Sequence, residues 1–395
     1  MNENRMSVGA FFRKYTMVIA LVVVVIFFAI ATNGGSLKPG SINNLIAQNG
    51  YVFVLAAGML LCILTGGNID LSVGSVVCFA AAVGCVMMDS KINMWLAVMA
   101  MLVIGLLIGA FQGFWIAKLH VPAFIATLSG MYAFRGFSNV VLQGYRVDIT
   151  NETFLFLFGG GRDCYIPDLI RQLTGTEGKP NLTCLAIGIV AVLVYVLMTV
   201  RKILIQRKLN IHQSIAGQAI TTALISAVVI FITWQLANLR GFPTVLIWIC
   251  LVLGAYQYIT TKTAIGRHLY AVGGNEKATA LSGVKTRNVY WFAYASIGLM
   301  AGLAGILTAA RAKGIDPTYG EGYEMDAIAS CFIGGASAYG GTGKISGVII
   351  GAVLMGVINQ GMNMVGVDSN LQKVVKGLVL LAAVIFDVLS KRQKR

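Results

Sequence analysis

Long apolar runs separated by short polar intervals are the feature that most constrains this 395-residue chain. Several runs approach or exceed the roughly 20 residues that a helix needs to cross a bilayer. With 57% hydrophobic and 11% charged residues, the chain cannot be a soluble globular protein. We therefore expect an all-α, polytopic inner-membrane protein with about 10–12 transmembrane segments, some of them short or broken. Residues 1–395 should form a single transmembrane domain.

About twelve segments are predicted to cross the membrane, beginning from a cytoplasmic N-terminus. The first is Tyr15–Ala31, for which a cleaved signal peptide ending near Ala31 is the alternative. We favour an uncleaved first span because so many spans follow. The later segments are Asn44–Leu64, Leu71–Met88, Met94–Ala117, Pro122–Leu142, Leu182–Val200, Gln218–Ala237, Pro243–Thr261, Trp291–Ala310, Ala327–Ala336, Ile345–Val365 and Leu371–Leu389. Ala327–Ala336 is too short to span the bilayer as a helix unless it is extended.

The net charge of +15 has a topological explanation. Basic residues collect in intervals that the alternation places in the cytoplasm, such as Arg201–Lys208 and the tail Lys391–Arg395. This is the distribution that the positive-inside rule predicts. Gln143–Pro180 and Arg311–Asp326 mix both signs and are predicted to lie outside. Both termini are therefore predicted in the cytoplasm, with membrane lipid around the chain and no nucleic-acid partner.

Lys262–Tyr290 is the most polar long interval among the apolar segments. It holds five Lys or Arg residues, Arg267 among them, against the single acid Glu276. This basic excess places the interval in the cytoplasm, and counting segments from the N-terminus gives the same side independently. Gly283 is placed to end a helix within the interval.

A turn and a short helix are predicted at the centre of this interval. Gly273 and Gly274 can form the turn, and we expect one of them to have a positive φ. Asn275 can cap a helix that has Glu276 in its first turn and continues to Leu281. A folded helix in such a loop favours docking of a partner over an ordinary solvated connector.

Two glycine-rich breaks interrupt the apolar pattern, at Thr65–Ser75 and at Gly340–Lys344. The first leaves almost no room for an external loop between two apolar segments. Non-helical backbone at membrane depth is tolerated only inside protein or beside a water-filled cavity. The blocks 44–142 and 290–389 each hold about four segments entered from opposite sides, which is the pattern of an inverted repeat.

Charged residues within the apolar pattern are candidates for a functional site. Asp70 either caps the helix that follows it or lines a solute pathway, and the two interpretations have equal weight. For Asp326, near the outer surface, capping is favoured. Arg135 either lines an outer cavity or pairs with an acid. The predicted pathway residues are Asn68, Asp70, Ser72 and Arg135. Three further charges are set aside because they can snorkel out of the membrane, namely Lys373, Lys376 and Asp387.

Catalytic and metal-binding constellations are missing from the sequence. Gly340–Lys344 invites comparison with a phosphate-binding loop, but Ile345 and Ala338 stand where such a loop needs Ser or Thr and its first Gly. The His residues are isolated and the Cys residues have no paired spacing, so we expect no metal site, no disulfide and no cofactor. The chain is therefore predicted to be a transporter and not an enzyme. An ion-coupled secondary transporter is one form that these features allow.

Gly66–Ser75 resembles the hallmark motif of bacterial monosaccharide ABC-importer permeases, the ribose, galactose and xylose group. Gly266–Ala278 resembles the coupling loop of the same family. Further resemblance covers Pro122–Leu128 with the following Arg135-Gly136, Ala301–Gly305 and Ala327–Gly335. The likeness extends from about residue 41 to residue 388.

The resemblance implies the permease subunit of an ATP-driven monosaccharide importer. Two copies would form the pathway, and a cytoplasmic ATPase with two nucleotide-binding domains would hold their coupling loops. A periplasmic sugar-binding protein would dock on the outer intervals and deliver the sugar. The residues that the resemblance assigns to the ATPase contact are Arg267, Gly273, Gly274, Asn275, Glu276, Lys277 and Leu281. A sugar site within the membrane is expected to be weak or absent, since a tight one would slow release.

The interval Asn181–Leu236 departs from the pattern of many family members, which have one linking span there. Two additional spans are predicted in this chain, and xylose-type permeases, with multiple-sugar relatives, are similar in this longer middle. Xylose or a mixed range of monosaccharides is therefore the leading substrate. A permease of the same superfamily for another solute, such as a branched-chain amino acid or a signalling furanose, is the alternative.

Overall fold

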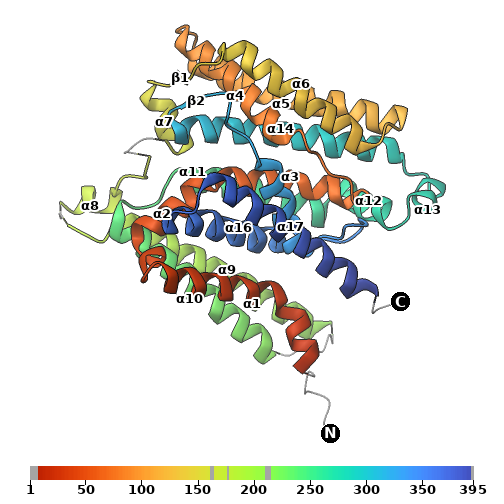
Figure 1. The fold of residues 1–395 in the computed structure, drawn as a ribbon. Coiled ribbons are helices and arrows are strands. Elements are labelled where there is room, and N and C mark those ends of the chain that lie inside the picture. Colours follow the sequence, from red (N-terminus) through yellow and green to blue (C-terminus); the bar gives the residue numbers. More distant parts are fainter. Residues whose placement is uncertain (1–7, 161–163, 176–177, 210–214, 393–395) are drawn as a thin grey trace.

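The computed structural model is a bundle of long helices with short helices and loops at its two ends (Figure 1). It describes residues 8–160, 164–175, 178–209 and 215–392. The first part of the chain forms α1 (Val8–Ala31), the 3-10 helix η1 (Gly35–Leu37), α2 (Pro39–Gln48), α3 (Gly50–Leu64), α4 (Val73–Asp89), α5 (Met94–Leu119), α6 (Ala123–Leu142), β1 (Val147–Asp148), α7 (Glu152–Phe158) and α8 (Leu169–Thr174).

The second part of the chain completes the bundle. It forms α9 (Leu182–Lys208), α10 (Ile215–Leu239), α11 (Val245–Lys262), α12 (Ala264–Gly274), α13 (Glu276–Leu281), α14 (Thr286–Ala312), β2 (Gly314–Ile315), α15 (Tyr323–Ile333), α16 (Ile345–Val365) and α17 (Ser369–Arg392). The two short strands pair in antiparallel fashion, with Val147 opposite Ile315.

Each segment predicted to cross the membrane contains a helix, although the helix in Ala327–Ala336 ends at Ile333 and Asn44–Leu64 is interrupted at Asn49. Among the described residues, six helices are long and apolar enough to span a bilayer, namely α5, α9, the Gly217–Leu239 part of α10, α11, α14 and α16. The pair α2–α3, bent by 43°, also qualifies if it is one broken span. Met17–Ala31 and α4 are shorter apolar helices. Helix α15 has 11 residues and is too short to cross on its own, as predicted.

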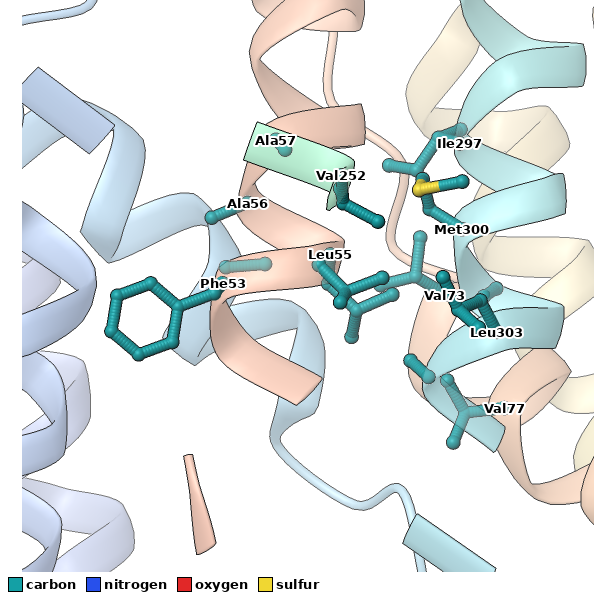
Figure 2. Close-up of a cluster of buried hydrophobic side chains, with 14 of the residues drawn as sticks. Phe53, Leu55, Ala56, Ala57, Val73, Val77, Val252, Ile297, Met300 and Leu303 are labelled. Atoms are coloured by element: carbon teal, nitrogen blue, oxygen red, sulfur yellow. The ribbon is translucent and has the colours of Figure 1, made fainter. Parts of the chain in front are cut away.

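Helix α3 lies within the bundle because it is apolar on every side. All of its residues except Tyr51 are buried. Figure 2 shows Leu55 packed among Val73 of α4, Val252 of α11 and Leu303 of α14. Because lipid tails are as apolar as these side chains, van der Waals packing rather than escape from water stabilises this core.

Helices α5 and α14 approach each other closely through facing glycines. A Cβ at Gly105 would lie 2.3 Å from the carbonyl oxygen of Gly298, and a Cβ at Gly298 would lie 2.3 Å from the carbonyl oxygen of Gly105. At Gly109 a Cβ would lie 2.3 Å from the carbonyl oxygen of Tyr294. The glycines spaced four apart on α5 therefore serve close helix packing.

The predicted additional spans correspond to α9 and α10, which pack against each other at one side of the bundle (Figure 1). In the most apolar part of each helix, only 11% of the residues of α9 and 6% of those of α10 are buried. Most of their apolar side chains therefore face away from the protein. Such a pair extends the bundle sideways without altering the packing around α3.

Candidate functional site

The break between α3 and α4 is held by hydrogen bonds of Asp70 and Ser72. Oδ1 of Asp70 accepts from the backbone N–H of Ser72 (2.8 Å) and from its hydroxyl (2.7 Å). Ser72 also shares a hydrogen bond with Gln112 of α5. Asp70 and Ser72 are 2% and 0% exposed. In this conformation Asp70 shapes the start of α4, while a pathway role for Asp70 and Ser72 stays a prediction.

The same turn occurs a second time, in the segment that leads to α15. Oδ1 of Asp316 accepts from the backbone N–H of Thr318 (2.9 Å) and from its hydroxyl (2.5 Å). The stretches Ile69–Ser72 and Ile315–Thr318 share the pattern Ile-Asp-x-Ser/Thr. This repeated pattern is visible in the sequence, but Asp316 and Thr318 were not among the predicted site residues. The third residue predicted at the first break, Asn68, is half-buried and donates to a backbone carbonyl of the same break.

A cavity of about 370 Å³ lies where α4 and α15 begin, beside α6 and α17. We call it the central cavity. Of the predicted pathway residues, only Arg135 lines it. The other polar and charged lining side chains are Ser75, Tyr132, Glu321, Glu324, Lys373 and Lys376. The two glutamates were missed because they lie in an interval that the sequence assigned to an external loop.

Arg135 projects from α6 into the segment that precedes α15. Its Nη1 donates to the carbonyl oxygens of Pro317 (2.9 Å) and Tyr319 (2.6 Å). Among the described residues, no carboxylate lies within ion-pair distance of Arg135. Of the two predicted alternatives, lining a cavity therefore describes Arg135, and pairing with an acid does not. The guanidinium fixes the segment before α15 against α6.

A buried ion pair joins α15 to α17. Nζ of Lys376 lies 2.9 Å from Oδ2 of Asp326, whose side chain is 0% exposed. The same oxygen accepts from the hydroxyl of Tyr51 (2.6 Å) and from Nδ2 of Asn359 (3.3 Å). Loss of the Lys376 charge would leave the fully buried Asp326 carboxylate without its counter-charge, which is strongly destabilising.

Two predictions about these charges were wrong. Asp326 does not cap α15, because the N-cap residue is Gly322 and no side chain makes a capping bond there. Lys376 does not snorkel outward, because Asp326 offers it a partner on the neighbouring helix. Asp387, set aside for the same reason as Lys376, has a structural contact: its Oδ2 accepts from the backbone N–H of Ala338 (3.0 Å), two residues before the second glycine break.

The interval predicted as a coupling loop forms α12 and α13 at one end of the bundle (Figure 1). Asn275 joins the two helices in an extended conformation, and its side chain accepts from the N–H of Ala278 (2.9 Å). The predicted cap is therefore confirmed. Helix α13 ends at Leu281, and Gly283 follows with a φ of +89°, so the predicted end of the helix is confirmed as well.

The pair Gly273 and Gly274 differs from the prediction. Both residues lie in the last turn of α12, and neither has a positive φ. Gly273 is needed for close approach instead: a Cβ there would lie 1.8 Å from the carbonyl oxygen of Leu64 and 2.3 Å from the nitrogen of Gly341. The N–H of Gly341 itself donates to Leu64 (3.0 Å). The coupling loop and both glycine breaks therefore meet at one point.

Helix α13 is fixed on one side and exposed on the other. Thr279 is buried, whereas Leu281 is 90% exposed. Tyr290 donates a hydrogen bond to the Glu276 carboxylate (3.0 Å). The other exposed residues predicted at the contact are Arg267, Gly274, Asn275 and Lys277. A fully exposed leucine gains free energy when a partner covers it, so this surface suits contact with another protein.

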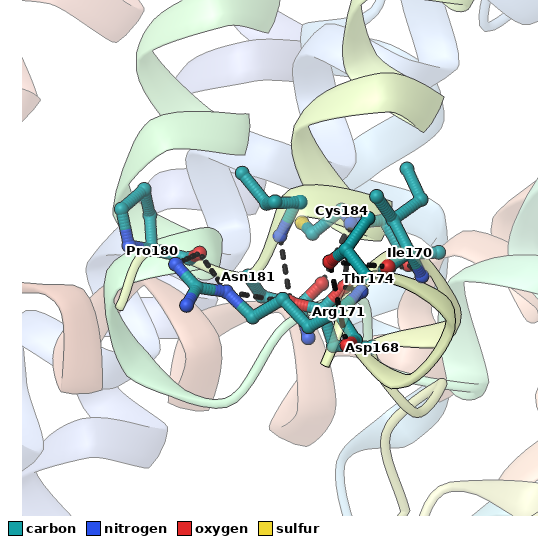
Figure 3. A network of polar contacts seen from close by, with 9 residues as sticks. Asp168, Ile170, Arg171, Thr174, Pro180, Asn181 and Cys184 are labelled. Atoms are coloured by element: carbon teal, nitrogen blue, oxygen red, sulfur yellow. Dashed lines mark hydrogen bonds and ion pairs between the residues drawn. The ribbon is translucent and has the colours of Figure 1, made fainter. Parts of the chain in front are cut away.

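Asp168 organises the segment between α6 and α9, at the end of the bundle opposite α13 (Figures 1 and 3). Its carboxylate accepts from the N–H of Leu182 (2.8 Å) and from the N–H and hydroxyl of Thr183 (3.1 and 2.9 Å). It also accepts from the N–H of Arg171, so it caps α8 while binding the start of α9. Asp163, in the same predicted docking interval, lies outside the described residues.

Comparison with known proteins places the chain in a family. Residues 41–384 match the family described as branched-chain amino acid transport system, permease component. The xylose transport system permease protein XylH of Escherichia coli (strain K12) is 33% identical over 387 residues, covering 96% of this chain and 92% of that protein. XylH of Haemophilus influenzae is 32% identical over 388 residues, covering 96% of this chain and 97% of that protein.

A ribose permease is similar to the same extent. The ribose import permease protein RbsC of Escherichia coli (strain K12) is 33% identical over 376 residues, covering 93% of this chain and 92% of that protein. No solved structure matches the chain. Because the family match and these alignments cover nearly the whole sequence, the chain belongs to this family of transport system permease components.

Proposed function

We propose that the chain is the transmembrane permease subunit of an ATP-driven importer for monosaccharides, with xylose or several sugars as its substrate. The observation that carries the proposal is the 33% identity to xylose and ribose permeases along nearly the whole chain. By their names those relatives are transport permeases, which agrees with the prediction of a transporter. The exposed, capped helix α13 supports the same function because it offers an ATPase a formed surface.

A cytoplasmic ATPase with two nucleotide-binding domains would contact α13 at Leu281. Gly273 packs directly on the backbone of Leu64 and Gly341, so a displacement of α13 would reach α3 and α16 through rigid contacts. ATP binding and hydrolysis would supply the free-energy difference between the two states of the pathway. The α13 end, toward which α1 begins and α17 ends (Figure 1), would be cytoplasmic, with the chain in the bacterial inner membrane.

A second copy of the chain would complete the pathway at the central cavity. Helices α6 and α17 flank this cavity and carry exposed apolar side chains. Tyr132 and Phe137 of α6 are 70% and 53% exposed, and Leu378 and Leu381 of α17 are 61% and 56% exposed. In a homodimer these faces would meet the partner copy and enclose the central cavity. Membrane lipid would cover the remaining apolar faces, including those of α9 and α10.

A periplasmic sugar-binding protein would dock at the end opposite α13, over the intervals 143–180 and 311–326. Both intervals mix acidic and basic residues, which suits polar and transient docking. The sugar would then enter the central cavity, and Asn68, Asp70, Ser72 and Arg135 would face or shape its route.

The nearer alternative is a permease of the same superfamily for another small solute. The family description names branched-chain amino acids, whereas the aligned relatives carry the names of two pentoses. An ion-coupled secondary transporter has less support. The buried carboxylates that it would use, Asp70 and Asp326, are engaged with Ser72 and Lys376.

The test is co-purification and uptake after co-expression of this chain with a candidate ATPase and a candidate sugar-binding protein. Leu281→Asp should remove the ATPase from the purified complex and abolish ATP-dependent uptake of xylose and ribose. The matched control is Leu173→Asp, because Leu173 is 88% exposed on α8 at the opposite end, and it should retain the ATPase. Uptake of leucine but of neither pentose would favour the alternative, and pentose uptake without any ATPase would overturn the proposal.

A further inference from the structure

A second polar cavity, of about 410 Å³, lies beside the central cavity. It is bounded by the bend between α2 and α3, the C-terminal end of α14, the start of α15 and the junction of α16 with α17. We call it the α16–α17 cavity. Its size is in the range of small-molecule sites. Lys376 lines both cavities, so the Asp326–Lys376 ion pair lies at the boundary between them.

Neutral amides dominate the polar lining of the α16–α17 cavity. They come from three parts of the fold and comprise Gln48, Asn49, Asn359, Asn363 and Gln372. An amide side chain both donates and accepts hydrogen bonds, as does each hydroxyl group of a sugar. The two cations at the cavity are Arg311 and Lys376, and Lys376 is neutralised by Asp326. The lining is therefore suited to an uncharged polyhydroxy compound better than to an anion.

Three buried polar atoms of charged and amide side chains around this cavity have no hydrogen-bond partner within the described part of the protein. They are Oδ1 of Asp326, Oδ1 of Asn359 and Nε of Arg311. Asp326 is 0% exposed and is bonded to the lining residues Tyr51, Asn359 and Lys376. Buried polar groups in native proteins are normally satisfied by protein, water or a ligand. These atoms are closed off from the cavity in this conformation, so the hydroxyl groups of a sugar would satisfy the two acceptors and the donor after the side chains turn toward it.

Two tyrosines add an aromatic wall. The rings of Tyr51 and Tyr323 are stacked, with centroids 3.6 Å apart and planes 13° from parallel. The hydrogen bond from Tyr51 to Asp326 fixes the first ring. An aromatic side chain offers an apolar body beside a polar tip. The C–H groups of a sugar ring can pack on such a body while its hydroxyl groups reach the amides.

This amide-rich lining is not shared by every cavity of the bundle. A cavity of about 350 Å³ between α1, α2, α3, α10, α11 and α16 has only two polar side chains among its described lining residues, Ser36 and Gln360. The polar lining of the α16–α17 cavity is therefore a local property of the segments that form it. A buried polar lining lowers the stability of a membrane protein unless its polar groups form hydrogen bonds.

We propose that the α16–α17 cavity binds a monosaccharide within each copy of the chain. The proposal rests on the proposed transport function and adds a specific place where the sugar pauses within the membrane domain. The family resemblance led to the expectation of a weak site or none. Release toward the central cavity then requires movement of Lys376, which makes the Asp326–Lys376 pair the barrier between the two cavities.

The direct test is sugar binding by the permease–ATPase complex in lipid nanodiscs, without the sugar-binding protein. Xylose and ribose should bind saturably to the unmodified complex. Asn359→Leu and Gln372→Leu should each weaken binding about tenfold or more, because each removes hydrogen bonds to the sugar. The control is Asn238→Leu on α10, whose amide donates to its own helix backbone at Trp234, and it should bind as the unmodified complex does.

A labelling experiment gives a second readout that does not depend on these variants folding. Asn363 is exposed at the cavity, so Asn363→Cys, in a chain without its native cysteines, should react with a small hydrophilic maleimide. Xylose or ribose should slow this reaction. Leu173→Cys on α8 should react at the same rate with and without sugar.

The outcomes separate the site from the function. A complex that imports sugar with its binding protein, yet shows neither saturable binding nor protection of Asn363→Cys, overturns the site alone. Inorganic phosphate that protects Asn363→Cys where sugars do not would identify an anion site and overturn the proposal as well. Sugar binding and protection without import by the complete system would support the site and contradict the proposed function.

Discussion

Gly74 and Gly320 contact each other reciprocally: a Cβ at either residue would lie 2.1 Å from the carbonyl oxygen of the other. Reciprocal contacts are what a two-fold relationship between two segments produces. The separation in sequence between Asp70 and Asp316 equals that between Gly74 and Gly320, and the two carboxylates form the same turn. Helices α4, α5 and α6 correspond in order to α15, α16 and α17. We infer that the blocks 44–142 and 290–389 are inverted repeats related by an axis near this contact.

The contact at Gly74 should be intolerant of any side chain. In Gly74→Ala the new methyl group meets the Gly320 backbone, which cannot move aside as a flexible side chain can. Overpacking of this kind costs about 1–3 kcal/mol, so we expect a lower midpoint of thermal unfolding in detergent. Gly254→Ala in α11, where nothing lies within 4 Å of the new Cβ, is the control. Equal midpoints for the two variants would contradict the close contact.

The two glycines at the end of α12 should differ in their tolerance of alanine. Gly273→Ala places a methyl group against Leu64 and Gly341, whereas Gly274→Ala meets open space. We expect Gly273→Ala to lose ATPase co-purification or sugar uptake while Gly274→Ala retains both. Both variants should still insert in the membrane. If Gly274→Ala is the more damaging, the turn predicted from the sequence, and not the packing of Gly273, is what the loop requires.

The Asp326–Lys376 pair should behave as a coupled unit. Lys376→Met leaves a buried carboxylate without its partner and should destabilise the protein by about 3–5 kcal/mol. Adding Asp326→Asn to that variant removes the uncompensated charge and should recover part of the lost stability. Thermal unfolding of the two single variants and the double variant measures the coupling. Additive losses would show that the pair does not interact in the membrane.

Lys373 provides the matched control for this pair. It forms an ion pair with Glu321 at 3.1 Å, but the two side chains are 65% and 51% exposed. Exposed pairs contribute about 0–1 kcal/mol. Lys373→Met should therefore leave the unfolding midpoint close to that of the unmodified chain.

The sequence was sufficient to predict the helices because apolar length and turn residues determine them. Thr65–Ser75 was predictable as a break because glycine and polar residues interrupt the apolar run, and Asn275 because Asn followed by Glu is a capping signal. The resemblance at Gly66–Ser75 and Gly266–Ala278 supplied the family. These features are local, so no knowledge of tertiary contacts was needed.

The contacts between distant segments were not predictable in the same way. Lys376 was predicted to snorkel because the sequence does not show that Asp326, on α15, lies beside it. Gly273 was assigned to a turn because glycine has two uses, positive φ and close approach, and only the neighbouring backbone distinguishes them. The lining of the α16–α17 cavity comes from segments far apart in sequence, and its amides carry no local signal.

Asp168 holds α8 to α9 through hydrogen bonds of its carboxylate (Figure 3). Partial burial raises the pKa of this carboxyl, but the hydrogen bonds from Leu182, Thr183 and Arg171 lower it more, so its pKa lies below the ordinary value. A lowered pKa means that the ionised form stabilises the folded segment. This stabilisation is fully present above the ordinary aspartate pKa of about 3.9 and is lost as the pH falls through the lower folded value.

We therefore expect the amides of Leu182 and Thr183 to be protected from hydrogen exchange at neutral pH and to lose protection in acid, after correction for intrinsic rates. In Asp168→Asn protection should be low at both pH values, because an amide nitrogen replaces an oxygen that accepts from these groups. Asp148→Asn is the control, since Asp148 pairs with Arg146 elsewhere and its side chain is 69% exposed. Unchanged protection in Asp168→Asn would mean that the packing of α9, and not the Asp168 carboxylate, holds this segment in place.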